Sequence, residues 1–341
     1  MLIALCILAG VLVLLLLGLG LAGACIYYRH FHTRFDGGGD YFPYYSALHS
    51  GWNRQAVSFP GGRGDTLRGY VFSYDPTPKA LIVLCHGYGM SLNDYLPECE
   101  YFCRAGYGVL AFDGSGVGVS DGILYGLPQH ILDLKACLDY VNSSSDLNRF
   151  PLLLYGHSWG GYAADCVSAL GQYPIRGIIS ASAFQVSTAG IGPHLERHWG
   201  KLAGLMLLGV RLFQRMRFGA LAKVTAVEGL RKTTAPVLIL QSDDDGIIHY
   251  RDNFEVLYVA FREDPRKTFL PLTGHNHNIT TPQSVDRAKR KLLKALRSGT
   301  ATAEELSEMD ALKAQVDEEL METFVGFYDD CLTGNGRGGA K

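Results

Sequence analysis

Ser158 lies in the sequence Gly-His-Ser-Trp-Gly, which occupies residues 156–160. The apolar residues 152–155 before it predict a buried strand, and residues 162–170 after it favour a helix. Ser158 is therefore predicted to sit on a sharp strand-to-helix turn, where glycines two positions away on each side leave room for the neighbouring backbone. The same five residues in a solvated loop would not indicate a nucleophilic serine. The strand and helix around them favour a hydroxyl presented at the end of a sheet, beside the positive end of a helix.

A serine hydroxyl becomes a good nucleophile only when a neighbouring base removes its proton, and a third group must orient that base. Two downstream segments supply such groups, each directly after an apolar run. The run at residues 237–241 precedes Ser-Asp-Asp-Asp at 242–245, and the run at 269–273 precedes Gly-His-Asn-His at 274–277. Parallel strands deliver a serine, an acid and a histidine in this chain order to one edge of a sheet. A metal site at the two histidines lacks a third and fourth ligand at suitable spacing.

The segments that must position these groups alternate between strands and helices. After a hairpin at residues 55–59 and 67–74, strands are predicted at 80–85, 108–112, 152–155, 175–181, 236–241 and 268–272. The intervening segments favour helices, the first opening at Ser91 and others at 132–141, 162–170, 253–261 and 288–296. This alternation predicts an α/β fold with a mostly parallel sheet covered by helices on both faces. The glycine-dense loop at 113–120 has neither the spacing nor the following helix of a dinucleotide-binding site.

The sheet pattern is interrupted between residues 184 and 234, where no strand is indicated. Residues 202–213 and their flanks instead favour helices that carry Leu, Met and Phe together with basic residues. The segment predicts a helical lid over 184–232. We expect its apolar face to cover the sheet, in preference to the alternative that its basic and apolar surface touches lipid.

The N-terminal residues 2–28 contain no charged side chain, and about 20 apolar residues suffice to cross a bilayer as a helix. A signal peptide would have a basic start and a shorter apolar centre, so an uncleaved anchor is favoured. The small residues 22–24 before Cys25 are the argument for cleavage. Arg29 and Arg34 follow the segment and no Lys or Arg precedes it, which places the C-terminal domain on the cytoplasmic side by the positive-inside rule.

Composition narrows the function classes. The chain has 341 residues, 48% of them hydrophobic, and its net charge of -2 reflects 31 basic and 33 acidic residues. A net charge so close to zero shows no excess of basic residues for binding nucleic acid, and it favours a small, apolar or weakly charged substrate. The eight cysteines lack paired metal-ligand spacing and are expected to be reduced thiols. No cofactor or metal is predicted, and the oligomeric state is left open.

An acidic C-terminal helix is predicted over residues 301–330, with apolar residues every three or four positions that would pack on the body: Leu306, Met309, Leu312, Val316, Leu320 and Phe324. The glycine-rich tail at 331–341 is expected to be disordered. The predicted division of the chain is therefore a transmembrane helix at 2–28, a connector at 29–54 and a core in two parts at 55–183 and 233–300. The lid at 184–232 separates the two parts of the core, and the C-terminal helix at 301–330 and the tail at 331–341 follow it.

Taken together, these features resemble the α/β-hydrolase superfamily, in particular its monoacylglycerol-lipase-like and serine-aminopeptidase-like serine hydrolases. The resemblance covers about residues 55–297. It rests on His-Gly-Tyr-Gly at 86–89, the loop at 113–120, the Ser158 motif, Asp245 and His275. It implies the α/β-hydrolase fold, with Ser158 as nucleophile and His275 as general base. It also implies an oxyanion hole made by the backbone N–H groups of Tyr88 and Trp159.

The resemblance also guides the choice between neighbouring candidates. The family usually has a glycine after the strand and its acid three residues later; here Ser242 replaces that glycine, so Asp245 is preferred, with Asp244 as the alternative. His275 is preferred over His277 because it follows Gly274 as the family pattern expects. His277 would then be a surface neighbour or a supporting contact. His157 and His86 are interpreted as structural, the latter bracing its own loop.

The implied function is a membrane-anchored serine hydrolase that cleaves an acyl ester, thioester or small amide through an acyl-enzyme. The anchor and the lid favour a lipid-like ester. A non-catalytic relative that serves as a binding scaffold is the alternative from another class, and an acyltransferase or peptidase could use the same residues.

Overall fold

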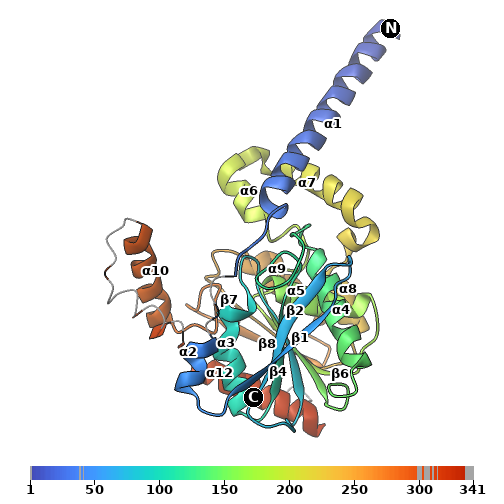
Figure 1. Ribbon diagram of the computed structural model, residues 1–341. Coiled ribbons are helices and arrows are strands. Elements are labelled where there is room, and N and C mark those ends of the chain that lie inside the picture. Colours follow the sequence, from blue (N-terminus) through green and yellow to red (C-terminus); the bar gives the residue numbers. More distant parts are fainter. Residues whose placement is uncertain are drawn as a thin grey trace.

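A computed structural model describes residues 2–37, 40, 42–297, 302, 308, 311–312 and 314–334. Its centre is an eight-stranded sheet in the order β1-β2-β4-β3-β5-β6-β7-β8 (Figure 1). The hairpin of β1 (Asn53–Pro60) and β2 (Thr66–Ser73) is antiparallel, as is the pairing of β2 with β4. All other pairings are parallel and join β3 (Leu81–Cys85), β4 (Gly108–Asp113), β5 (Leu152–His157), β6 (Ile175–Ala181), β7 (Val237–Ser242) and β8 (Lys267–Leu272). The predicted α/β class is confirmed.

Helices cover both faces of this sheet. One face packs against α4 (Gln129–Ser143), α5 (Trp159–Cys166), α8 (Ala226–Lys232) and α9 (Tyr250–Phe261), and the other against α3 (Leu96–Arg104) and α12 (Glu318–Thr333). Strand β3 illustrates the cause: Val83 and Cys85 belong to one apolar core, and Ile82 and Leu84 belong to the other. Successive side chains of a strand point to opposite faces, so a sheet covered on both sides requires an unbroken apolar run.

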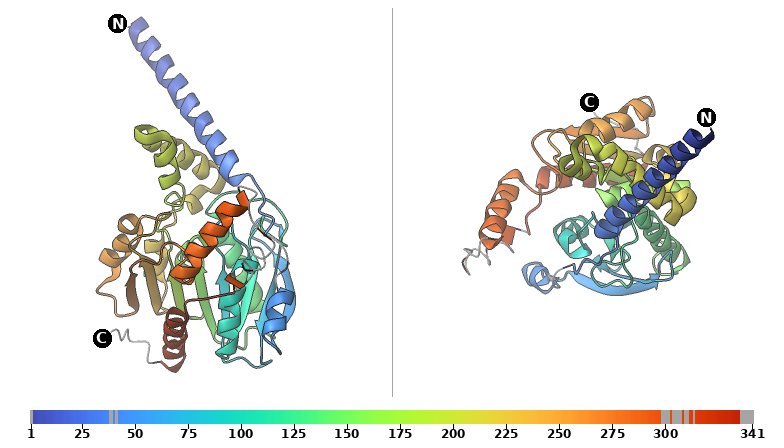
Figure 2. Two further views of the ribbon diagram at one scale, coloured as in Figure 1. Left: turned by 90° about the vertical axis from the view of Figure 1, so that its left-hand side faces the viewer. Right: turned by 90° about the horizontal axis from the view of Figure 1, so that it is seen from above.

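The N-terminal helix α1 (Leu2–Phe31) projects from the body, as Figures 1 and 2 show. Within the described part of the chain it is the one helix that is long and apolar enough to cross a membrane, a test that a signal sequence near an N-terminus would also pass. The helix continues three residues past the predicted boundary at residue 28. The predicted connector at 29–54 therefore begins inside α1, and it contains a short helix, α2 (Phe42–Leu48).

The helical insertion at residues 184–232 contains α6 (Gly192–Trp199), α7 (Ala203–Phe218) and α8, with short 3-10 turns at Gly200–Leu202 and Gly219–Lys223. The expectation that its apolar face covers the sheet is wrong for α7, which packs on α1 and α6. Figures 1 and 2 show α6 and α7 beside the base of α1, away from the strands. Gly23 and Gly209 allow the close approach, because a Cβ on Gly23 would lie 2.3 Å from the carbonyl carbon of Gly209.

The C-terminal region differs from the prediction of one helix over 301–330. Residues 315–317 are not helical, and α12 begins at Glu318, where the Asp317 carboxylate accepts a hydrogen bond from the Leu320 N–H at 3.0 Å. Asp317 is a favourable N-cap, which explains the break. The helix α12 extends to Thr333, so the start of the predicted disordered tail at 331 is wrong; residues 335–341 lie outside the described residues, as do Leu306 and Met309. Before this region, α10 (Gln283–Arg297) follows β8.

Candidate active site

Ser158 lies between β5 and α5 in the predicted turn, with a φ of 55° and a ψ of -111°. A positive φ is uncommon for a residue with a side chain, and it is maintained here by the packing of the flanking glycines. A Cβ on Gly156 would lie 2.4 Å from the Gly160 oxygen, and one on Gly160 would lie 2.0 Å from the Cys85 oxygen. The two glycines thus let the first turn of α5 approach β3 and β5 closely, which aims the Ser158 side chain away from the sheet.

Asp245 lies in the loop that follows β7, and its buried carboxylate accepts four hydrogen bonds. One oxygen accepts from the backbone N–H groups of Ile247 and Ile248, both at 2.9 Å. The other accepts from the Gln241 side chain at 3.2 Å and from a histidine ring at 2.8 Å. The loop therefore holds the carboxylate in a fixed position beneath the histidine.

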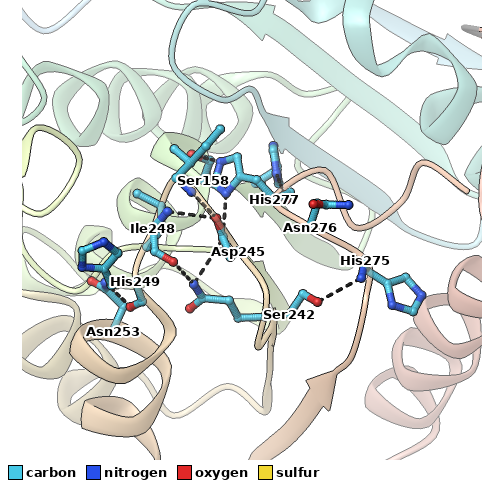
Figure 3. A network of polar contacts seen from close by, with 12 residues as sticks. Ser158, Ser242, Asp245, Ile248, His249, Asn253, His275, Asn276 and His277 are labelled. Carbon is cyan, nitrogen blue, oxygen red and sulfur yellow. Dashed lines mark hydrogen bonds and ion pairs between the residues drawn. The ribbon is translucent and has the colours of Figure 1, made fainter. Parts of the chain in front are cut away.

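His277 is the histidine that joins these two groups. Its Nε2 lies 2.9 Å from the Ser158 Oγ, and its Nδ1 lies 2.8 Å from the Asp245 Oδ2. Figure 3 shows the ring between the serine and the carboxylate. Since the carboxylate can only accept, Nδ1 carries a proton, and Nε2 is left to accept the serine proton in the neutral ring.

The prediction that His275 faces Ser158 is wrong. Its ring points away from Ser158 and lies against Asp317, with 3.5 Å between Nε2 and Oδ2 (Figure 3). The physical reason is the path of the loop: Gly274 and Asn276 both have positive φ values, of 76° and 57°, and the His275 N–H donates to the Ser242 Oγ. These turns aim residue 275 outward and bring residue 277 back over the sheet edge.

The other two aspartates of the segment 242–245 stabilise the loop that carries His275 and His277. The Asp244 carboxylate accepts from the Ser242 hydroxyl at 2.6 Å and from the Asn276 N–H at 3.0 Å. The Asp243 carboxylate accepts from the Thr273 hydroxyl at 3.2 Å. Both therefore join the loop after β7 to the loop after β8, and neither contacts the His277 ring.

His157, which precedes the serine, supports the backbone of His277. Its Nε2–H donates to the His277 carbonyl oxygen at 3.0 Å, and its Nδ1 accepts from the Tyr95 hydroxyl at 2.7 Å. The same hydroxyl accepts from the Gly87 N–H at 2.9 Å. Burial lowers the pKa of His157 to about 3, and the neighbouring His277 acts in the same direction, so the ring is neutral. This chain of bonds joins the histidine loop to the 86–89 loop through two buried side chains.

His86 braces its own loop. Its Nε2 accepts from the Gly114 N–H at 2.9 Å, and the other ring nitrogen donates to the Gly87 carbonyl oxygen at 2.8 Å. Burial, with His130 nearby, lowers the pKa of His86 to about 3. A neutral ring is thus built into the turn that carries Tyr88.

Of the two residues predicted to form the oxyanion hole, Trp159 follows Ser158 in the chain and Tyr88 lines the same cavity as Ser158. Trp159 is the first residue of α5, so its N–H is one of those that a helix leaves without an intrahelical acceptor. Its ring is fully buried and donates to the Leu127 carbonyl oxygen at 2.7 Å. The Tyr88 ring contacts the rings of Trp159 and Phe31 with centroid separations of 5.9 Å in both cases, and its hydroxyl donates to the His30 carbonyl oxygen.

A cavity of about 390 Å³ lies above Ser158 and His277. Its wall is mostly apolar and comes from several parts of the chain, including Leu127, Phe184 and Ile191. His30 and Phe31 at the end of α1 also line it, together with His194 of α6. Sequence reasoning missed this contribution because an apolar N-terminal helix predicts only membrane contact, and no local pattern indicates that its last turn closes a pocket.

The described residues contain no group of three or more His, Cys, Asp or Glu side chains that could hold a metal ion. All eight cysteines are free, with Cys6 and Cys25 exposed on α1 and the others buried.

Comparison with known proteins places this geometry in context. Residues 76–227 match the family described as serine aminopeptidase, S33. The uncharacterized protein YfhR of Salmonella typhi is 26% identical over 237 residues, which cover 65% of this chain and 74% of YfhR. A monoacylglycerol lipase of Mycolicibacterium smegmatis is 31% identical over 111 residues, or 32% of this chain and 39% of the lipase.

Solved structures share the architecture at low sequence identity. An esterase of Pyrococcus furiosus superposes with a TM-score of 0.58 and 18% identity, over 78% of this chain and 97% of the esterase. An alpha-beta hydrolase of Vibrio vulnificus superposes with a TM-score of 0.56 and 15% identity, over 78% of this chain and 88% of that chain. At such identities the similarity establishes the fold.

Proposed function

We propose that this chain, which has the α/β-hydrolase fold and matches the family described as serine aminopeptidase, S33 over residues 76–227, is a serine hydrolase that cleaves an acyl ester, or a thioester or small amide, through an acyl-enzyme. The observation that carries the proposal is the chain of contacts from Ser158 through His277 to Asp245, at 2.9 and 2.8 Å, on the floor of an apolar cavity. In this proposal His277 takes the role that the sequence interpretation gave to His275. Ser158 and Asp245 keep their predicted roles.

The steps of the proposed reaction follow from the contacts of the His277 ring with Ser158 and Asp245 and from the protons that these groups exchange. The Ser158 oxygen attacks the acyl carbonyl while its proton passes to the His277 Nε2, and the Asp245 charge stabilises the resulting imidazolium. The carbonyl oxygen becomes negative and accepts hydrogen bonds from the N–H groups of Trp159 and Tyr88. Collapse breaks the bond to the leaving group, which takes the proton from His277. Water, deprotonated by the same ring, then attacks the acyl-enzyme and releases the acid.

A lipid-like ester is the substrate class that the surroundings favour. The cavity wall is mostly apolar, and the end of a helix long enough to cross a membrane forms part of it. The monoacylglycerol lipase of Mycolicibacterium smegmatis is similar to this chain over 111 residues. An apolar acyl chain gains free energy on leaving water for such a cavity, about 0.8 kcal/mol for each buried CH₂ group.

An active-site label tests the proposal directly. A fluorophosphonate probe should label the wild-type chain, and Ser158→Ala should remain unlabelled. A folded wild-type chain that resists the probe would instead favour a binding scaffold without catalysis. A panel of esters of increasing acyl length, with matched thioesters and amides and an added alcohol as acceptor, then separates ester hydrolysis from acyl transfer and peptidase activity.

We also propose that α1 anchors the enzyme, with the catalytic domain on the cytoplasmic side. The support is the presence of Arg29 and Arg34 directly after the apolar segment. In sealed vesicles of cytoplasmic-side-in orientation, the domain should be protected from added protease. Digestion of the domain in the absence of detergent would show that the orientation is the opposite one.

A further inference from the structure

The length of α1 indicates where a bilayer would end. Residues Leu2 through Gly23 form 22 residues of helix, which at 1.5 Å per residue span roughly 33 Å, close to the hydrocarbon thickness of a bilayer. Gly23 is also the position at which α7 crosses α1, because it contacts Gly209. The large apolar side chains on the far side of this crossing are exposed from Leu2 to Leu17. When α1 spans a membrane, α7 therefore lies at the boundary between hydrocarbon and head groups.

The outer face of α7 suits that position. Leu205, Leu208, Leu212 and Met216 recur every three or four residues and are 45–80% exposed, while Met206 and Val210 are buried on the opposite side. Arg211 and Arg215 are exposed beside the apolar residues. A helix with an apolar face bordered by arginines is typical of one that lies in the plane of a membrane surface. Its contact with α1 makes the bilayer the natural partner of this face.

A groove of about 560 Å³ lies between α1 and α6. Ile26 and Arg29 of α1 and His198 and Trp199 of α6 line it. His30 and His194 line both this groove and the cavity above Ser158, and their ring centroids are 4.7 Å apart. The groove and the cavity therefore adjoin at two imidazole rings, which lie between the level of the head groups and the serine.

Apart from Cys25 and the indole of Trp199, the polar side chains that line the groove are basic or titratable to a cation. They are Arg29, His30, His194 and His198, with the His194 and His198 rings 4.2 Å apart, and no acidic residue is among the groove's lining residues. Glu196 of α6 lies between the two histidines in sequence and is absent from the lining. Arg29 lies six residues beyond Gly23, or roughly 9 Å past the hydrocarbon edge. Phosphate groups of lipids occupy this level, and the Arg29 guanidinium binds phosphate through charge-assisted hydrogen bonds. Burial lowers the pKa of His30 and the pKa of His194, and nearby basic groups act in the same direction, so these two rings offer neutral N–H donors to the phosphate.

We infer that this groove binds the phosphate of a membrane lipid, and that the substrate of Ser158 is a phosphate-bearing acyl lipid taken laterally from the bilayer. The inference deepens the proposed hydrolase function and rests on it. Arg29 and His198 hold the head group at the membrane surface. His30 and His194 stand between the head group and the ester, so the acyl carbonyl reaches Ser158 while the phosphate remains in the groove.

Kinetics with two lipids of equal acyl chain test this assignment. The full-length enzyme in detergent micelles should hydrolyse an oleoyl lysophosphatidate with a higher kcat/KM than oleoyl glycerol. In Arg29→Gln/His198→Gln that ratio should fall about tenfold through KM, since each tenfold corresponds to about 1.4 kcal/mol of lost binding. The matched control Arg262→Gln removes an exposed arginine at the end of α9 and should keep the ratio. Turnover of soluble p-nitrophenyl butyrate shows that each variant is folded and has a working serine.

Equal rates for the two lipids in the wild type, or a ratio that survives the double substitution, would overturn the inference. Added glycerol 3-phosphate should inhibit only weakly; inhibition as strong as that by the lipid would indicate a site for soluble anions instead.

A binding measurement separates failure of the inference from failure of the proposed function. Ser158→Ala with a diazirine-bearing lysophosphatidate should cross-link within residues 25–30 and 194–199. Unlabelled lysophosphatidate should compete, and oleoyl glycerol should not. This readout requires no hydrolysis, so cross-links elsewhere would contradict the groove even in a protein without esterase activity.

Discussion

At the scale of single residues, the site depends on which of two histidines two positions apart turns inward. His277 contacts both Ser158 and Asp245, and His275 contacts Asp317. The three adjacent aspartates divide in a similar way. Only Asp245 contacts the inward histidine, while Asp243 and Asp244 tie the two loops together. One member of each group therefore belongs to the chain of contacts that starts at Ser158, and its neighbours set the loop geometry.

Substitution of each histidine should separate these roles. We expect His277→Gln to lower kcat for a soluble ester by roughly 10³-fold or more, because the His277 ring is the base in hydrogen-bond contact with the Ser158 oxygen. The matched variant His275→Gln should retain most activity, since its ring contacts Thr273 and Asp317 and points away from Ser158. Steady-state kinetics on p-nitrophenyl butyrate measure both. Loss of activity in His275→Gln with full activity in His277→Gln would show that the loop rearranges.

The aspartates give a second comparison. Asp245→Asn should lower kcat by roughly 10³- to 10⁴-fold, since an amide cannot stabilise the imidazolium as a carboxylate does. Asp244→Asn and Asp243→Asn should reduce thermal stability more than kcat, because their carboxylates accept hydrogen bonds within the loops. Kinetics together with melting temperatures separate the two effects, and a fully active Asp245→Asn would refute this assignment.

At the scale of elements, the helix after the serine carries an unusual buried acid. Asp165 of α5 is 1% exposed, and one of its oxygens accepts from the Ser180 hydroxyl of β6 at 2.8 Å. Burial raises the pKa of this carboxyl to about 7, although the Ser180 hydrogen bond and the charge of Lys267 oppose the shift. The helix that presents Ser158 is thus anchored to the sheet by a group that changes charge near neutral pH.

This raised pKa has a consequence for stability. Between about pH 4 and pH 7 the folded chain holds the Asp165 proton while the unfolded chain releases it, so stability falls as pH rises through that window. Asp165→Asn cannot ionise, and its free energy of unfolding relative to the wild type should increase from pH 5 to pH 7.5. Urea denaturation at both pH values provides the comparison. An identical pH dependence in the two proteins would show that Asp165 is ionised throughout.

At the scale of the whole molecule, the N-terminal helix and the α/β body share one interface. The helix α1 packs on α7, ends at the wall of the cavity above Ser158 and receives a hydrogen bond from Tyr88 at the His30 carbonyl. The helix α1 and the candidate active site are therefore not joined by a free tether. In the proposed anchored enzyme, the orientation of the body on a bilayer follows from the angle at which α1 leaves it (Figure 2).

A fluorescent label on α7 tests this orientation. With exposed Cys6 and Cys25 replaced by serine, Leu212→Cys carrying an environment-sensitive dye should be quenched by doxyl-labelled lipids in reconstituted vesicles. The control Arg149→Cys, in the exposed turn before β5 at the opposite end of the sheet, should remain unquenched. Equal quenching at both positions, or none at residue 212, would mean that α7 does not touch the membrane.

The sequence by itself determined the architecture and most of the chemistry. Apolar runs of strand length alternate with helical segments, and the Ser158 motif and the acidic loop follow such runs, so their place at one sheet edge was predictable from the chain. Periodicity reports whether a segment is buried, and strand ends report which edge a loop occupies. Both are local properties, written in neighbouring residues.

Only the tertiary structure decided which side chains meet. The inward turn of His277 depends on positive φ values at Gly274 and Asn276 and on hydrogen bonds to a loop more than thirty residues away. The partner of α7 is α1, almost two hundred residues earlier, because two glycines allow their backbones to touch. Such choices arise from contacts between distant segments, which no local pattern of residues specifies.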